Sequence, residues 1–324
     1  MSKYKSRLLA ELKTAQEEAR DKLAVALDDS KTARQRLAAF SKAGAISDES
    51  NAQKALAIID DDDAHAGLRA AALEKIASYY GHDEQFLQKL TRIATRNGAP
   101  GELRMAALSS LRSNSFSSAT LLSQRPAYIA ALRALVDDED DDIRETAIEN
   151  LALNQDEYVQ RRLIEGLENP KSKLTKPELA VKYLSYDLHA DHFPILRKLA
   201  VKAPNKKTRM EALRNLAADA DSADILKSVF ADKSEDAELR HLCGVGLQRL
   251  DPVNFEKASN KILRARAEHQ ELKAAILNTK MHQPGADMNK LAADIKKLGN
   301  KAKGTAEKSR VEKLSSFAAF RKSG

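Results

Sequence analysis

Apolar and small residues recur along this chain in one pattern around an arginine. An apolar residue or threonine comes directly before the arginine, a small residue stands at offset +3, and further residues that are mostly apolar stand at +4 and +7. Offsets −1, +3, +4 and +7 share one face of an α-helix, so each copy predicts an amphipathic helix. The copies are centred on Arg69, Arg104, Arg144, Arg209 and Arg240.

A sixth and weaker copy has Pro177 at the arginine position, and successive copies are then 35, 40, 33, 32 and 31 residues apart. Second amphipathic segments lie between the copies, as in 83–95 and 158–167. A helix pair of this kind cannot bury its own apolar face, whereas stacked pairs bury one another's faces. The pattern therefore predicts an all-α protein, a right-handed α-solenoid of helix pairs. Cys243 occupies the small +3 position, which indicates a core residue and not a nucleophile.

The same periodicity divides the chain into four predicted parts. Residues 1–46 are expected to form N-terminal capping helices, with a dimerising coiled coil as the alternative for the first helix. About six helix pairs follow in 47–252, and one long helix in 253–282 closes the array. Residues 283–324 are expected to be a basic, partly flexible tail. The tail ends in a short amphipathic segment whose apolar residues could dock on the solenoid or on a partner: Leu314, Phe317 and Phe320.

Charge is distributed unevenly along the 324 residues. The segment 255–324 has 16 Lys and Arg against 7 Asp and Glu, a net of +9, whereas the whole chain has +7, so the remainder carries −2. A basic segment can bind nucleic acid, an acidic protein or an anionic surface. No window is apolar enough to span a membrane, and one cysteine allows no intrachain disulfide, so a cytoplasmic location is expected.

Clustered acids precede several of the arginine-bearing helices, most clearly in 60–63 and 137–142. Carboxylates at a helix N-terminus cap its free N–H groups and oppose the helix dipole. Ligation of Ca²⁺ or Mg²⁺ is the alternative, although the runs lack the glycine-punctuated spacing of a calcium loop.

These segments, such as the acidic run 137–142 followed by Ile143 and Arg144, resemble the HEAT-like repeats in the short form found in phycobilin-lyase-type proteins. The resemblance covers about residues 51–250. It implies an armadillo-like solenoid in which turn acids and helix arginines form a ladder between repeats. The ladder residues would be Arg69, Arg104, Arg144, Arg209 and Arg240, with partners in the preceding acidic turns and an interruption at Pro177.

Motifs of catalysis are missing from the sequence. It contains no glycine-rich phosphate loop, no Gly-x-Ser-x-Gly elbow, no Cys-x-x-Cys pair and no His-Glu-x-x-His motif. No His-Glu pair occurs either, which argues against the HEAT-like iron hydroxylases. The best metal candidate is the group Asp187, His189 and His192, although Asp and His are also ordinary at the helix junction expected there. No cofactor is expected.

The leading hypothesis is therefore a non-enzymatic scaffold or adaptor that binds a protein or peptide on the concave face of the solenoid. Offsets +1, +5 and +6 from the arginine are expected to face outward there and give the binding residues Glu74, Lys75, Glu145, Glu149, Asn150, Lys182 and Arg214. The first alternative is nucleic-acid binding through the basic C-terminal segment. A less favoured alternative is a HEAT-like enzyme such as a chromophore lyase. The sequence leaves the oligomeric state open.

Overall fold

A computed structural model describes residues 3–115, 119–187, 191–302 and 304–323. Over these residues the chain is helical without any strand. The helices are α1 (Lys3–Leu27), α2 (Ala33–Phe40), α3 (Glu49–Asp60), α4 (Ala66–Ile76), α5 (Glu84–Thr95), α6 (Gly101–Ser115), α7 (Ala119–Ala134), α8 (Asp141–Leu153), α9 (Glu157–Glu168), α10 (Pro177–Leu184), α11 (Phe193–Val201), α12 (Lys206–Leu216), α13 (Ala223–Ala231), α14 (Ala237–Leu250), α15 (Pro252–Arg264), α16 (Gln270–Met281), α17 (Met288–Gly299) and α18 (Thr305–Ser323). Short 3₁₀ turns occupy Pro170–Ser172 and Ala220–Ser222.

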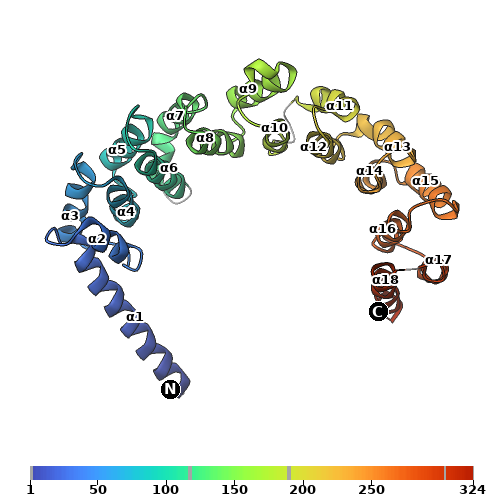
Figure 1. The fold of residues 1–324 in the computed structure, drawn as a ribbon, viewed down its shortest axis with the longest axis horizontal. Coiled ribbons are helices and arrows are strands. Elements are labelled where there is room, and N and C mark those ends of the chain that lie inside the picture. Colours follow the sequence, from blue (N-terminus) through green and yellow to red (C-terminus); the bar gives the residue numbers. More distant parts are fainter. Residues whose placement is uncertain (1–2, 116–118, 188–190, 303, 324) are drawn as a thin grey trace. The chain divides into compact units, whose positions relative to one another are not determined.

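The chain divides into two compact units, residues 1–159 and 160–324. Most helices pair with the next helix along the chain, from α1–α2 to α7–α8 in the first unit and from α11–α12 to α17–α18 in the second, and every second helix belongs to a row of its own. The row is α2, α4, α6 and α8 in the first unit and α10, α12, α14, α16 and α18 in the second. Figure 1 shows this two-layered stacking, so the all-α helix-pair architecture expected from the sequence is confirmed.

Small residues let the second helix of each pair approach its neighbours. The +3 residues Ala72, Ala107, Ala147, Ala212 and Cys243 are all completely buried. Two glycines of α14 show how close the contacts are. A Cβ at Gly244 would lie 2.8 Å from the Phe230 ring, and one at Gly246 would lie 2.9 Å from the Ala217 Cβ. The sequence therefore uses small residues where helices cross.

An arginine side chain ties the two helices of most pairs together. The Nε of Arg69 donates to the carbonyl of Ile59 at 3.0 Å, and the Nε of Arg104 donates to that of Ala94 at 3.0 Å. Ile59 and Ala94 are the second-to-last residues of α3 and α5. Carbonyls in the last turn of a helix have no intrahelical partner, and a cation there also complements the helix dipole. Arg209 and Arg240 make the equivalent bonds to Ala200 and Phe230.

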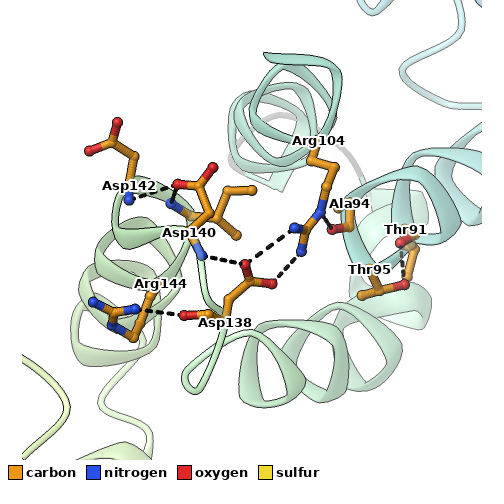
Figure 2. A network of polar contacts seen from close by, with 9 residues as sticks. Thr91, Ala94, Thr95, Arg104, Asp138, Asp140, Asp142 and Arg144 are labelled. Atoms are coloured by element: carbon orange, nitrogen blue, oxygen red, sulfur yellow. Dashed lines mark hydrogen bonds and ion pairs between the residues drawn. The ribbon is translucent and has the colours of Figure 1, made fainter. Parts of the chain in front are cut away.

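The other guanidinium nitrogens reach an acid in the next repeat. Arg104 forms a forked pair with Asp138 in the turn before α8, as Figure 2 shows. Arg209 pairs with Glu235 before α14, and Arg240 pairs with Glu268 before α16. The family resemblance predicted that the acidic partner lies in the preceding turn, and this prediction is wrong for these three arginines. Their side chains extend along the stack, so that each link joins two consecutive pairs.

The two remaining ladder arginines bond within their own turn. Arg69 contacts Asp62, and Arg144 contacts Asp141 together with the carbonyl of Asp138 at 2.6 Å. The turn that would supply a forward acid to Arg144 is basic, with Lys171, Lys173 and Lys176. Pro177, which begins α10, has no side-chain donor of its own. The ladder therefore stops after Arg104 and resumes at Arg209.

The terminal regions continue the repeat further than the sequence pattern indicated. The Nε of Arg36 in α2 donates to the Ala26 carbonyl of α1 at 3.1 Å, and Lys273 of α16 donates to the Ala265 carbonyl that ends α15. Arg36 and Lys273 are each 33 residues from the nearest ladder arginine. The long helix expected in 253–282 is therefore wrong, because the segment folds as the α15–α16 pair.

The first helix covers the end of the array only through its C-terminal part. Leu23, Ala26 and Leu27 are buried, whereas Leu8 and Leu12 remain 45% and 51% exposed. In Figure 1, α1 continues well beyond α2. At the other end, the flexible tail expected in 283–324 is corrected, since α17 and α18 pack on each other and on α16.

Candidate functional site

A groove of about 1320 Å³ lies between α14, α16 and α18 in the second unit. We call it the C-terminal groove. Glu271, Ala275 and Asn278 of α16 line it together with His282, which follows the helix, and their spacing of 4, 3 and 4 residues places them on one face. Leu272 and Ala274 of α16 line the groove as well. From α18 come Arg310, Lys313, Leu314 and Phe317, which again share one face.

The α13–α14 turn and the start of α14 form one edge of the groove, which is mainly acidic because Glu235, Asp236 and Glu238 line it with a single lysine, Lys233. Asp236 caps α14 by accepting the N–H of Glu238 at 2.9 Å. The ammonium of Lys206, 2.9 Å away, is the main cause that lowers the pKa of the Asp236 carboxyl. Asp236 is therefore held in place as an anion by Lys206 of the preceding repeat.

The opposite edge, on α18, is basic. Arg310 reaches across to Glu271 of α16 at 2.8 Å and fixes the spacing of the two helices. Lys313 is exposed, and within the described residues it forms no ion pair. An acidic edge and a basic edge therefore face each other across the groove.

Apolar side chains form the floor between these edges. Leu272 of α16 and Leu314 of α18 are both buried. Leu272 belongs to the core that α16 shares with α14, whereas Leu314 lies in a cluster of α16 and α17 residues against which Phe317 also packs. The Phe317 ring stacks on His282 with a centroid distance of 4.9 Å. Of the three apolar residues expected to dock, Leu314 and Phe317 thus contact this chain's own helices, while Phe320 is 73% exposed.

Three histidines line the groove, His241, His269 and His282. His241 lies beside Thr279, with 3.4 Å between Nε2 and Oγ1, and burial lowers its pKa. His282 Nδ1 lies 2.8 Å from the carbonyl of Asn278. Across the described ranges no three His, Cys, Asp or Glu side chains are grouped so as to hold a metal ion. The groove offers shape, charge and apolar surface for binding.

Two members of the metal candidate at the α10–α11 junction are described, Asp187 and His192. Asp187 accepts a hydrogen bond from Gln160 Nε2 at 2.8 Å. His192 is completely buried against Phe193, and burial lowers its pKa. His189 lies outside the described residues.

The residues expected to face outward from the repeat helices differ in exposure. Glu74, Lys182 and Arg214 are exposed, and three others are half-buried: Lys75, Glu145 and Glu149. Asn150 is a correction, because it is 3% exposed and its Nδ2 donates to the Thr146 carbonyl at 2.8 Å. Offset +6 therefore turns inward there, whereas +1 and +5 remain accessible.

The groove residues on α16 and α18 were missed by the sequence pattern, although a signal for them exists. His241 is at offset +1 from Arg240, and Ala274 and Asn278 are at +1 and +5 from Lys273. Finding this repeat would have required accepting lysine at the arginine position together with Ile276 at +3 and Lys280 at +7, where the pattern has a small and an apolar residue.

Comparisons with known proteins add little. No family model matches the chain, and no curated protein does. A solved structure of human deoxyhypusine hydroxylase in complex with glycerol aligns with 96% of this chain and 98% of its own, at 15% sequence identity and a TM-score of 0.29. So low a score carries no argument about fold or activity. Along the described chain, none of the helices combines the length and apolar character needed to cross a bilayer.

Proposed function

We propose that this protein is a non-enzymatic scaffold of the HEAT-like repeat kind that holds a segment of a protein partner in the C-terminal groove. The observation that supports this function is the groove's cross-section, an apolar floor between an acidic and a basic edge. At about 1320 Å³ the groove also exceeds the roughly 300–1,000 Å³ typical of small-molecule pockets.

The groove chemistry specifies the kind of segment. Leu272, Leu314 and Phe317 suit apolar side chains at helical spacing, as in the recognition of an amphipathic helix by a groove. Basic residues of the segment would lie near Glu238, and acidic residues near Lys313. The two charged edges thereby set the orientation of the bound segment, because reversing it would place like charges together.

Site-specific crosslinking tests this function directly. A photoreactive residue is introduced at Asn278, which lines the groove, and as a control at Lys261, an exposed position on α15 outside it. A partner crosslinked at 278 but not at 261 is identified by mass spectrometry, and its segment is purified. Equal crosslinking at both positions would show that the groove is not the binding site.

Two charge reversals on the purified complex complete the test. Glu238→Lys and Lys313→Glu each place a like charge beside the segment, and each is expected to weaken its affinity by about tenfold. Both side chains are exposed, so the melting temperature should not change. Unchanged affinity in both variants would contradict the proposal.

A further inference from the structure

A second cavity, of about 420 Å³, lies between α15, α16 and α17 on residues separate from the C-terminal groove. Five cationic side chains line it against one carboxylate, that of Asp294. The cations are Arg264, Lys273, Lys290, Lys297 and Lys301. Asp294 pairs with Lys297 at 3.1 Å, and within the described part of the chain the other four cations have no carboxylate partner. The cavity therefore carries a large uncompensated positive charge.

Lys273 is the most unusual of these cations. It stands at the ladder position of the α15–α16 pair, is 4% exposed, and donates to the Ala265 carbonyl. Burial, and then the charge of Lys301, lower the pKa of its ammonium group. Glu268 is the nearby carboxylate whose charge raises this pKa again, but it is already paired with Arg240, and no ion pair to Lys273 forms among the described residues. A buried cation without a close counter-charge is costly.

Comparison with the preceding helix pair shows that a carboxylate is missing beside Lys273. In the preceding pair, Arg240 makes the same backbone bond and also holds the carboxylate of Glu268 from the next turn. The turn after α17 should supply the equivalent acid to Lys273, but residues 300–305 contain lysines and no acid. The position that a carboxylate occupies elsewhere in the ladder thus lies beside the cationic cavity.

The first turn of α16 gives an independent sign of a ligand. Gln270 lines the cavity, and its Oε1 is buried without a hydrogen-bond partner. Rotation of this amide would present its N–H₂ group instead, since the oxygen and nitrogen exchange places. No side chain caps α16, because His269 makes no capping bond. An uncapped helix start favours an anion nearby.

We propose that this cavity binds a compact anion with two or more phosphate groups, which takes the place of the missing ladder acid beside Lys273. Four unpaired cations match an oligophosphate better than a single carboxylate. The cavity volume suits a small molecule, whereas a nucleic-acid strand would need a basic surface extending along several helices. The proposal is independent of the partner groove, which uses other side chains.

Binding is tested on the full chain with inorganic pyrophosphate and tripolyphosphate, by calorimetry and thermal unfolding. Both probes should bind, and saturation should raise the melting temperature by about 3 °C. Orthophosphate should bind at least about tenfold more weakly, because it satisfies fewer cations. Absence of binding and of any shift at millimolar pyrophosphate would overturn the proposal.

Two variants locate the site, and a third serves as a matched control. Lys290→Glu combined with Lys301→Glu reverses two exposed lining charges and should abolish the pyrophosphate shift. Lys273→Met removes the buried ammonium while keeping its volume, so the chain should stay folded but lose at least about tenfold in affinity. Lys257→Glu combined with Lys261→Glu changes the charge equally on exposed positions of α15 outside the cavity and should leave binding intact.

A single-stranded oligonucleotide separates the two sources of phosphate. Under the proposal it competes poorly with pyrophosphate, and its weak binding falls equally in both double variants. Tighter binding of the oligonucleotide than of tripolyphosphate would indicate a diffuse nucleic-acid surface and would overturn the compact site. Loss of pyrophosphate binding in the Lys257→Glu, Lys261→Glu control would have the same meaning.

Discussion

Arg240 and Glu268 form a forked ion pair, with distances of 2.8 and 2.9 Å, whose side chains are 1% and 3% exposed. Burial alone would raise the pKa of the Glu268 carboxyl, but the hydrogen bonds from Arg240 and from the His269 backbone N–H, together with the charge of Arg240, lower this pKa. The pair joins α14 to the turn before α16, in the next repeat.

Removing one member of this pair should therefore be costly. Arg240→Ala leaves a buried carboxylate and the Phe230 carbonyl without a partner, and the free energy of unfolding should fall by about 3–5 kcal/mol. Arg144→Ala is the matched control, because Arg144 bonds only within its own turn, and it should cost less than about 1 kcal/mol. Urea denaturation measures both. Equal losses in the two variants would mean that the link between repeats contributes nothing.

Close approach at α14 gives a second prediction. In Gly246→Ala the new methyl group would meet both the Ala217 Cβ and the Leu226 Cδ1 at 2.9 Å. Overpacking costs about 1–3 kcal/mol, whereas alanine gains up to about 1 kcal/mol in helix propensity, so the net effect should be a loss of stability. Val245→Ala, at an exposed neighbouring position, should change stability by less than about 0.5 kcal/mol. A Gly246→Ala variant more stable than the parent would refute the close packing.

His192 gives the protein a pH-dependent stability. Burial lowers its pKa below 6.5, against the opposing charges of Asp187, Asp191 and Asp219. The unfolded chain therefore takes up this proton more readily, and the stabilisation is present above pH 6.5 and lost as the pH falls toward the folded-state pKa. His192→Phe should flatten the decline in unfolding free energy between about pH 7 and pH 5.

The matched control for this titration is His269→Gln, which removes an exposed imidazole and should leave the decline as it is in the parent protein. Denaturation curves collected across the same pH range decide the matter. If His192→Phe and the parent lose stability in parallel, the buried imidazole is not responsible.

Lys182 and Arg214 test whether a bound partner extends beyond the groove. They lie on α10 and α12, which belong to the same row of helices as α14, and both are exposed. Alanine at both positions should weaken capture of the partner without lowering the melting temperature. A drop in melting temperature would instead make these side chains structural.

The repeat period was sufficient to predict helices, their pairing and the buried small residues, because a strict pattern at 3.6-residue spacing specifies one apolar face. The pattern failed to predict the pairs in which the residue that donates to the carbonyl of the preceding helix lies in a different sequence context. Lys273 makes the same backbone bond from a sequence that the pattern rejects, and Arg36 follows a glutamine instead of an apolar residue. The α15–α16 pair was therefore missed.

The partner of Arg240 and the location of the groove needed coordinates for a different reason. Only Arg240 has acids both in the turn before its own helix and in the turn before the next repeat helix, and the structure shows that it reaches Glu268. The turns before α6 and α12 contain no acid, a signal in the sequence that the family resemblance overrode for Arg104 and Arg209. Glu271 and Lys313 become neighbours of one groove only because α18 packs back onto α16. Such packing depends on apolar contacts between distant segments, which a local pattern does not specify.

Hydrogen exchange with and without the partner segment would test the scaffold function most directly. The bound segment should slow amide hydrogen exchange in the three stretches that line the C-terminal groove, 235–241, 271–282 and 310–317. Exchange in α13 and α15 should not change. Protection confined to α13 and α15, or no protection in the groove at saturating segment, would contradict the assignment of partner binding to this site.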